Sequence, residues 1–316
     1  MGQQKKRAVV GIGAANVDVH GRSQKPIVMR DSNPGFLCTS VGGVTRNILE
    51  NLSRQGVPAT LLSAVGDDVY GEKILRESAA AGIDVSHVLL KKGAASSCYI
   101  AVLDETGDML LGMSDMRIIQ QLGSAYPEEN RALFQSADAV VCDACLPAEF
   151  LDELTSGAAR GARVLIDPVS TAYARQMEPV AGQFYGIKPN EMELAVLSGK
   201  PTGTEAEIER ACEALLDRGV FCVAVSRGKR GCYYADADGV RMFRALRPAE
   251  TMANATGAGD AFMAGFVHGL VDGLPPEERL DYALASGVTA IQSMSTINPD
   301  MSDALVKKNI ERYRLS

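Results

Sequence analysis

The order of strand-like and helix-like segments is the feature that most restricts the fold of this chain. Apolar runs typical of buried strands occur at residues 139–142, 164–166 and 220–226. Helical patterns occupy residues 151–160 and 205–217, each between two of those runs. Alternation at this spacing predicts βαβ units and therefore a mainly parallel sheet covered by helices.

The N-terminal part adds further elements of the same kind. Residues 8–13 and 60–65 are predicted as buried strands. An amphipathic helix opens at Gly42 and Gly43, and residues 71–81 carry another helix. A chain of 316 residues is long enough for one large α/β domain, and we expect residues 1–316 to form a single one.

Two stretches do not fit this alternation. Residues 19–40 contain many turn formers and no core periodicity, with short extended pieces expected at 27–29 and 36–39. Residues 96–115 resemble a hairpin. Together they could form a small separate sheet, and a long segment without core periodicity is often a lid over a ligand site.

Composition excludes several classes of protein. Apolar residues make up 46% and charged residues 22%, with a net charge of −7 and no long basic run, so a nucleic-acid surface is not expected. Lys5, Lys6 and Arg7 lead only into the short apolar run 8–12, which is not a secretory signal. No apolar run approaches the ~20 residues of a membrane span. We therefore expect a cytoplasmic protein.

The seven cysteines are scattered and predict no disulfide framework. Cys142 and Cys145 form a Cys-x-x-Cys pair, but a redox or zinc site would need a low-pKa environment or a second ligand pair. Because Cys142 continues the apolar run 139–141, we interpret it as the end of a buried strand.

The loop and helix at residues 254–266 carry the strongest chemical signal. The small residues from Thr256 to Gly259 lead into a helix expected at 261–271, whose first turn offers free N–H groups to an anion such as a phosphate. Asp260 lies at the same place and could accept a proton from a hydroxyl that attacks a phosphoryl group. The alternative is an ordinary glycine-rich loop with Asp260 as a helix cap.

Polar side chains also follow the first strand. Asn16 and Asp18 lie where open α/β sheets bind ligands, and an amide beside a carboxylate suits vicinal hydroxyls. Asn16 stands where a dinucleotide fingerprint needs its third glycine, which disfavours a Rossmann dehydrogenase. Arg46 and Asn47 lie near the start of the helix after Gly43. A surface turn and a simple helix entry are the alternatives.

Two later motifs join strand ends to polar turns. Asn190 and Glu193 could form a capping box or organise water around a phosphate-bound Mg²⁺. Ser226, Gly228 and Gly231 form a basic turn between two strands that could meet nucleotide phosphates, or be a solvated turn. The sequence contains no Walker-type phosphate loop.

Taken together, the motifs resemble those of the ribokinase-like (PfkB) sugar and nucleoside kinases. The resemblance runs from about Ala8 to about Pro299, nearly the whole chain. It is carried, in the order seen in that family, by Gly42-Gly43 with Asn47, Asn190-x-x-Glu193, Ser226-x-Gly228-x-x-Gly231 and Thr256-Gly257-Ala258-Gly259-Asp260.

The resemblance implies a three-layer α/β/α sandwich with a small β-sheet lid formed by about 19–40 and 96–115, often a homodimer through the lids. It implies ATP and Mg²⁺ as cofactors, with a nucleoside or sugar as substrate. The implied roles are as follows: Asp260 as general base; Gly257, Ala258 and Gly259 as the anion hole; Asn16, Asp18, Gly42, Gly43 and Asn47 on the ribose; Asn190 and Glu193 on Mg²⁺; Ser226, Gly228, Gly231, Asn190 and Thr256 at the nucleotide.

The closer likeness within the family is to members that phosphorylate the 5′-hydroxyl of pseudouridine. It rests on residues 31–35, 42–47, 114–116, 167–170 and 254–256. Arg46, Asp31 and Asp115 are the predicted contacts to the base, from their places near the lid and the Gly-Gly helix.

Three questions stay open at this point. Asn254 is neutral where many family members carry an aspartate that helps to bind a monovalent cation, so activation by K⁺ is a weaker expectation than use of ATP and Mg²⁺. The substrate could instead be ribose, fructose or adenosine. The chain could also be a catalytically silent, ligand-sensing relative, although the intact Gly257-Ala258-Gly259-Asp260 argues against this.

Overall fold

The larger of the two main sheets confirms the predicted parallel arrangement. A computed structural model describes residues 8–250 and 252–314; Lys5, Lys6 and Arg7 lie outside them. The nine strands lie in the order β15-β14-β13-β12-β11-β10-β1-β4-β6. Every neighbouring pair from β13 to β6 is parallel, whereas β14 and β15 are antiparallel additions at one edge. The strands are β1 Val9–Ile12, β4 Ala59–Leu62, β6 Ile83–Asp84, β10 Ala139–Asp143, β11 Val164–Asp167, β12 Gly186–Ile187, β13 Cys222–Ser226, β14 Cys232–Asp236 and β15 Arg241–Arg244.

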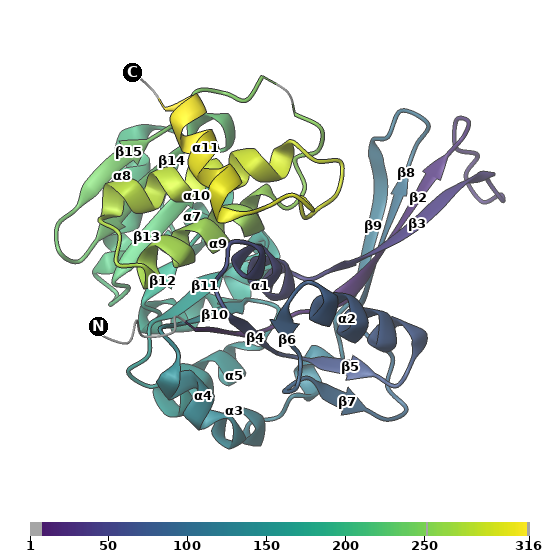
Figure 1. Cartoon of the computed structure of the whole chain (residues 1–316), viewed down its shortest axis with the longest axis horizontal. Helices are drawn as coiled ribbons and strands as arrows, with labels where there is room; N and C mark the ends of the chain where they lie inside the picture. The colour runs from purple at the N-terminus through teal and green to yellow at the C-terminus, as the bar shows by residue number, and fades with distance from the viewer. Residues whose placement is uncertain (1–7, 251, 315–316) are drawn as a thin grey trace.

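Helices cover both faces of this sheet, which makes three layers (Figure 1). One face packs against α1 Val44–Arg54, α9 Ala258–Val271 and α10 Pro276–Ile291, with α11 Asp303–Tyr313 outside them. The other face packs against α3 Ala125–Glu129, α4 Arg131–Ser136, α5 Ala148–Glu153 with the π-helical turn Leu154–Ala158, α6 Thr171–Met177, α7 Glu191–Ser198 and α8 Glu205–Leu216. Short 3₁₀ turns lie at Ile119–Gln121, Glu178–Gln183 and Gly228–Arg230.

The buried strands are apolar throughout because both of their faces are covered. In β13, Val223 and Val225 belong to the core beneath α7 and α8, whereas Cys222 and Ala224 belong to the core beneath α9 and α10. Successive side chains of a strand point to opposite faces, so a strand between two helical layers needs apolar residues at every position. This is the physical origin of the uninterrupted apolar runs in the sequence.

A four-stranded sheet, which we call the small sheet, projects from the body of the molecule (Figure 1). Its order is β3-β2-β8-β9. Its strands are β3 Gly35–Gly42, β2 Asn16–Ser23, β8 Cys98–Leu103 and β9 Met109–Asp115. At its base lie α2 Val69–Ala80 and a two-stranded sheet of β5 Ala64–Gly66 and β7 Leu89–Lys91.

Of the two extended pieces predicted within residues 19–40, residues 36–39 lie inside β3, but the prediction for the rest of the segment was too irregular. β2 and β3 pair over eight residues each, and only 24–34 form a connecting loop. Residues 27–29 lie in that loop and are not extended into a strand. Six of the eight residues of β3 are exposed, so backbone pairing with β2 holds the strand in place and no burial pattern marks it in the sequence.

Two element boundaries also differ from the prediction. The run 60–65 is two strands, β4 and β5, separated at Ser63, whose hydroxyl donates to the carbonyl oxygen of Gly13 at 2.7 Å. The glycine-loop helix begins at Ala258, three residues earlier than expected. No helix in the described part of the chain is both long and apolar enough to cross a bilayer.

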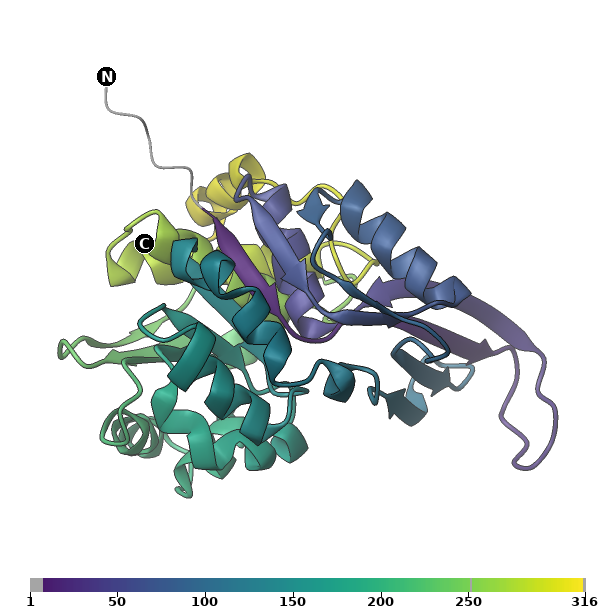
Figure 2. The ribbon, with the colours of Figure 1, turned by 90° about the horizontal axis from the view of Figure 1, so that it is seen from below.

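The topology brings distant segments to one edge of the large sheet. The loop after β1, the ends of β10 and β11 and the residues after β12 all lie at the carboxyl ends of parallel neighbours. Seen from below, the purple N-terminal part of the chain continues from this edge into the small sheet (Figure 2). Open α/β sheets bind their ligands at such an edge.

Candidate active site

The N-terminus of α9 forms one wall of the candidate site. Gly257 has a φ of 81°, and a Cβ there would lie 2.1 Å from the carbonyl oxygen of Thr296, so this position needs glycine. No side chain among the described residues caps the helix. The N–H of Ala258 makes only a long hydrogen bond, 3.4 Å, to the carbonyl oxygen of Ala255. The other first-turn N–H groups and the positive end of the dipole are available to an anion beside Asp260.

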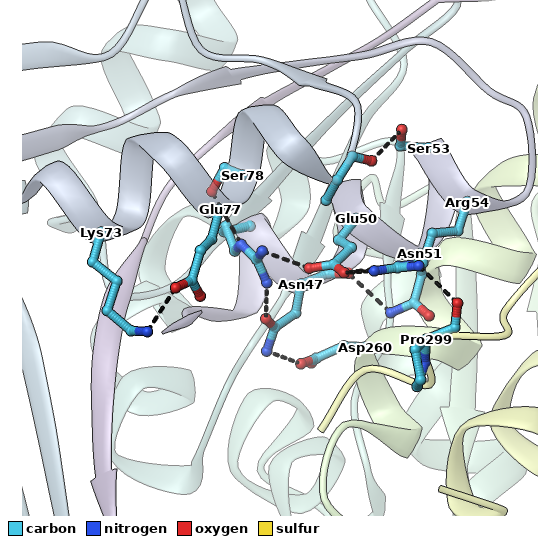
Figure 3. A network of polar contacts seen from close by, with 12 residues as sticks. Asn47, Glu50, Asn51, Ser53, Arg54, Lys73, Glu77, Ser78, Asp260 and Pro299 are labelled. Carbon is cyan, nitrogen blue, oxygen red and sulfur yellow. Dashed lines mark hydrogen bonds and ion pairs between the residues drawn. The ribbon is translucent and has the colours of Figure 1, made fainter. Parts of the chain in front are cut away.

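Asp260 lies in the first turn of α9 and is held by α1. Asn47 Nδ2 donates to Asp260 Oδ2 at 2.9 Å, although the two residues are 213 positions apart (Figure 3). Burial, with the nearby Asp167 carboxylate, raises the pKa of Asp260 to about 7, although the Asn47 hydrogen bond and Lys188 pull it down. A carboxylate with a pKa near neutrality is suited to accepting a proton.

Asn47 is itself fixed by a buried ionic network. Arg46 is 3% exposed and its guanidinium pairs with Glu50 at 2.5 Å. The same guanidinium donates to Ser78 Oγ of α2 at 3.2 Å and to Asn47 Oδ1 at 3.3 Å. Arg54 closes the other side of Glu50 at 2.7 Å. The side chain of Arg46, predicted as a base contact, is thus engaged with protein groups between α1 and α2.

The start of β2 and the end of β3 form the opposite wall. Asn16 Nδ2 donates to Asp18 Oδ1 at 2.7 Å, and burial raises the pKa of Asp18. A Cβ on Gly42 would lie 2.2 Å from Asp18 Oδ2. Gly43 has a φ of 102°, and a Cβ there would meet the carbonyl oxygen of Ala14 at 2.4 Å. The Gly42-Gly43 pair therefore makes room for Asp18 and for the loop after β1.

A carboxylate that the sequence did not single out organises this corner. Asp143, at the end of β10, is fully buried. Its Oδ2 accepts from Ala14 N at 2.8 Å, from Thr45 N at 3.1 Å and from Thr45 Oγ1 at 2.6 Å, and its Oδ1 accepts from Cys145 N at 3.1 Å. A Cβ on Gly13 would lie 2.5 Å from Oδ2. One side chain thus holds the loop after β1 and the start of α1.

The motif after β12 forms the capping box that was one of its two predicted alternatives. Asn190 and Glu193 form a reciprocal capping box, with bonds of 2.8 and 2.9 Å. Burial raises the pKa of Glu193. No cluster of three or more His, Cys, Asp or Glu side chains able to hold a metal directly occurs in residues 8–250 and 252–314. These groups therefore fit only a magnesium ion that is held mostly by phosphate oxygens and water.

Lys188 and Asp167 are two further charged groups at this edge, to which the sequence analysis assigned no role. Lys188 is 6% exposed, and its Nζ lies 3.1 Å from Asp167 Oδ2. Burial lowers the pKa of Lys188, but Asp167, Glu193 and Asp260 together outweigh burial, so the pKa is raised and the ammonium stays charged. The sequence signal was available, because Lys188 directly precedes the Pro189-Asn190 pair.

The basic turn lies beside this cluster. Ser226 forms a parallel bridge with Asn190, which joins the two nucleotide-site motifs. Gly231 has a φ of 82°, and a Cβ there would lie 2.1 Å from the carbonyl oxygen of Arg244; Gly228 has a φ of 57°. Thr256 is exposed in the glycine loop, where its N–H donates to Asn254 Oδ1 at 3.0 Å.

The structure does not bring every predicted site residue together. Asp31 is exposed in the loop between β2 and β3, where it accepts from Ser32 N. Asp115 ends β9, pairs with Arg117 and lies on the face of the small sheet opposite to Asp18, since it is in register with Cys98 and Val17. As contacts to the base, Asp31, Asp115 and Arg46 stay predictions.

The Cys-x-x-Cys pair has the character of a buried strand end. Cys142 and Cys145 are buried, and burial together with Asp143 raises the pKa of both thiols well above the ordinary value. A thiol held in its neutral form is a poor nucleophile and a poor metal ligand.

Comparisons with known proteins agree with this architecture. The model of the pfkB family carbohydrate kinases matches residues 6–304. The chain is 35% identical over 309 residues to the pseudouridine kinase of Escherichia coli K12, covering 98% of each protein. It is 31% identical over 293 residues to an uncharacterized sugar kinase of the same organism, YeiI, covering 93% of this chain and 80% of YeiI.

A solved structure extends the agreement to the fold. The ribokinase of Arabidopsis thaliana, complexed with ribose and ATP, superposes with a TM-score of 0.88 at 21% identity, covering 98% of this chain and 99% of the ribokinase. The fold is thus ribokinase-like, a parallel sheet between helical layers with a small separate sheet. The chain belongs to the pfkB family. It is a sugar or nucleoside kinase, a phosphotransferase that acts on an alcohol group.

Replacement of the buried Asp143 tests the corner that it organises. Asp143→Asn places an amide N–H₂ among groups that all donate, so we expect a loss of about 2–4 kcal/mol of unfolding free energy. Urea unfolding of both proteins measures this loss. Asp238→Asn, at an exposed aspartate, is the matched control and should change stability little. A loss below about 0.5 kcal/mol for Asp143→Asn would mean that these hydrogen bonds do not hold the corner.

Proposed function

We propose that this kinase transfers the γ-phosphoryl group of ATP to the 5′-hydroxyl of pseudouridine, giving pseudouridine 5′-phosphate. The observation that carries the proposal is the meeting of Asp260, at the free N-terminus of α9, with the Asn47 side chain of α1. The identity with the Escherichia coli pseudouridine kinase supports the substrate, because it extends over 98% of both chains.

In this proposal the ribose lies between the two walls of the site. The adjacent Asn16 and Asp18 side chains, with Asn47 and the backbone of Gly42 and Gly43, hold the ribose hydroxyls. The close approach of Asp18 to Gly42 supports this, since any larger residue at 42 would displace the carboxylate. Asp260 then accepts the proton of the 5′-hydroxyl as that oxygen attacks the γ-phosphorus.

The phosphates of ATP face the N-terminus of α9. The amides of Gly257, Ala258 and Gly259 form the anion hole for the transferred phosphoryl group. The rest of the nucleotide is contacted by Asn190 before α7, by Ser226, Gly228 and Gly231 at the basic turn, and by Thr256 in the glycine loop. Magnesium, when bound, would neutralise phosphate charge, with Asn190 and Glu193 orienting its water. Activation by K⁺ and a cytoplasmic location stay predictions from the sequence.

The small sheet is the proposed lid of the site. Its strands β2 and β3 begin and end at Asn16 and Gly42, so movement of the sheet would move the ribose-binding wall. The face that carries Asp18 also carries Ser40, Tyr99 and Ser114, which share its register row. This polar row is available to a bound nucleoside.

A coupled ADP-release assay on a panel of acceptors tests the substrate. We expect pseudouridine to have a kcat/KM at least tenfold above those of uridine, adenosine, ribose and fructose, and turnover to require Mg²⁺. A higher value for ribose, fructose or adenosine would assign the chain to another specificity within the family. No ADP release with any acceptor would instead support a ligand-sensing relative.

The variant Asp260→Asn tests the proposed base. We expect kcat to fall by ~10²-fold or more while ATP binding is kept, and wild-type kcat to rise with pH through about 7 as the carboxylate ionises.

The raised pKa of Asp260 also affects stability. The protonated side chain contributes to the free energy of unfolding below pH ~4, and this contribution is lost as the pH rises through about 7. The melting temperature of Asp260→Asn should therefore be higher than that of wild type at pH 8 but not at pH 4.

Asp238→Asn serves again as the control and should leave turnover and melting temperature close to wild type. Near-wild-type turnover of Asp260→Asn, with no change in the pH profile, would remove Asp260 from the role of base.

We also propose a homodimer formed through the small sheets. The face opposite to Asp18 exposes a group of large apolar side chains, Leu37, Ile100, Leu111 and Met113, with 44–79% of each exposed. Exposed apolar patches on a sheet are typical of interfaces. Light scattering should give a dimer for wild type and a monomer for Leu37→Glu/Met113→Glu, with Val69→Glu, at an exposed position of α2, as the control. A wild-type monomer at all concentrations would exclude this interface.

A further inference from the structure

Lys188 lies against the glycine loop at the proposed phosphoryl site. It follows β12 directly and is almost completely buried. A Cβ built on Gly259 would lie 3.4 Å from Lys188 Nζ, which is ordinary van der Waals contact. The ammonium therefore lies beside the second glycine of the loop that begins α9.

A strained turn holds the partner of this lysine. Asp167 Oδ2 lies 3.1 Å from Lys188 Nζ, while Asp167 Oδ1 accepts from Val169 N at 2.8 Å. Val169 has a φ of 65°, a conformation that a β-branched residue adopts only when the surrounding structure imposes it. Both oxygens of Asp167 are thereby occupied, and its orientation toward Lys188 is set.

The charges around the loop explain why a cation is needed there. Asp167 and Glu193 are buried, and Asp260 and Asp143 lie close enough for their charges to interact. A phosphoryl group brought to the N-terminus of α9 would meet these carboxylates in a region of low dielectric, where like charges repel strongly. Lys188 is the cation that acts on Asp167, Glu193 and Asp260 together.

We propose that Lys188 is a catalytic residue that donates a hydrogen bond from its ammonium to an oxygen of the transferred phosphoryl group, and that Asp167 is its positioning residue. An ammonium has three donors, of which Asp167 takes one. The proposal rests on the phosphotransferase activity of the family and not on the identity of the nucleoside.

The step balances without a further reactant. A bond forms between the acceptor oxygen and the γ-phosphorus, and the bond from that phosphorus to the β,γ-bridging oxygen breaks. The hydroxyl proton passes to Asp260, and the electron pair of the broken bond stays on ADP. Lys188 keeps its proton throughout and stabilises the charge that spreads over the phosphoryl oxygens.

Three substitutions at one position test this role. Lys188→Met removes the charge, Lys188→Gln removes it but keeps a donor for Asp167, and Lys188→Arg keeps the charge and moves it. We expect the two neutral variants to lose ~10²-fold or more in kcat, with the KM of the nucleoside within threefold of wild type. Lys200→Met, at an exposed lysine just after the C-terminus of α7, is the matched control.

The pH profile provides a readout that a merely structural role would not move. Lys188 lowers the pKa of Asp260, whereas Asp143 and Asp167 raise it and the Asn47 hydrogen bond lowers it. Loss of the cation should therefore shift the acid limb of kcat to higher pH in both neutral variants, and Lys188→Arg should return it toward wild type.

Wild-type kcat and an unmoved acid limb in a folded neutral variant would overturn the proposal. If neither neutral variant folds, Lys188→Arg tests the proposal instead. Its displaced charge should lower kcat at least fivefold at unchanged KM. Full activity of Lys188→Arg would contradict the proposed role of Lys188. Wild-type ADP release measured in the same assays separates this outcome from a failure of the proposed substrate.

Discussion

The site depends first on the hydrogen bonds of one buried carboxylate, Asp143. It ends a central strand and accepts from Ala14 in the loop after β1 and from Thr45 at the start of α1. The first segment leads to Asn16 and Asp18, and the second leads to Asn47, which contacts Asp260. Since these bonds are buried, removing their acceptor would leave unpaired donors, and the geometry of both walls follows from one side chain.

The second constraint is electrostatic. Four acidic side chains, Asp143, Asp167, Glu193 and Asp260, lie at one sheet edge, and burial raises the pKa of Asp260 to about 7. Such crowding costs stability and is tolerated at sites where chemistry uses it. The buried Lys188 limits that cost by pairing with Asp167. A second ion pair, between Arg46 and Glu50, stabilises the first turns of α1. Positive charge at the glycine loop therefore comes from Lys188 and from the N-terminus of α9.

The sequence alone determined the fold class and the class of reaction, phosphoryl transfer to an alcohol group. Apolar runs that alternate with helical patterns predicted buried strands. The sequence predicted that Gly42, Gly43 and Gly257 let a ligand come close to the backbone. The structure adds that a Cβ built at any of them would lie 2.1–2.4 Å from a carbonyl or carboxylate oxygen. The sequence predicted only residues 36–39 of β3, because six of the eight residues of this strand are exposed and backbone pairing alone holds the rest in place. The prediction of an extended piece at residues 27–29 was wrong for a related reason: a short apolar run does not show whether another strand pairs with it.

Only the tertiary structure decided which polar groups meet. Asp143, Asp167 and Lys188 are spread over 46 residues of sequence and carry no common motif, yet parallel pairing of β10, β11 and β12 places them at one edge. Likewise Arg46, near Asn47 in sequence, turns to Glu50 and Ser78 because α2 packs beside α1. Local sequence determines which element a residue joins, whereas the register and packing of distant elements determine what its side chain touches.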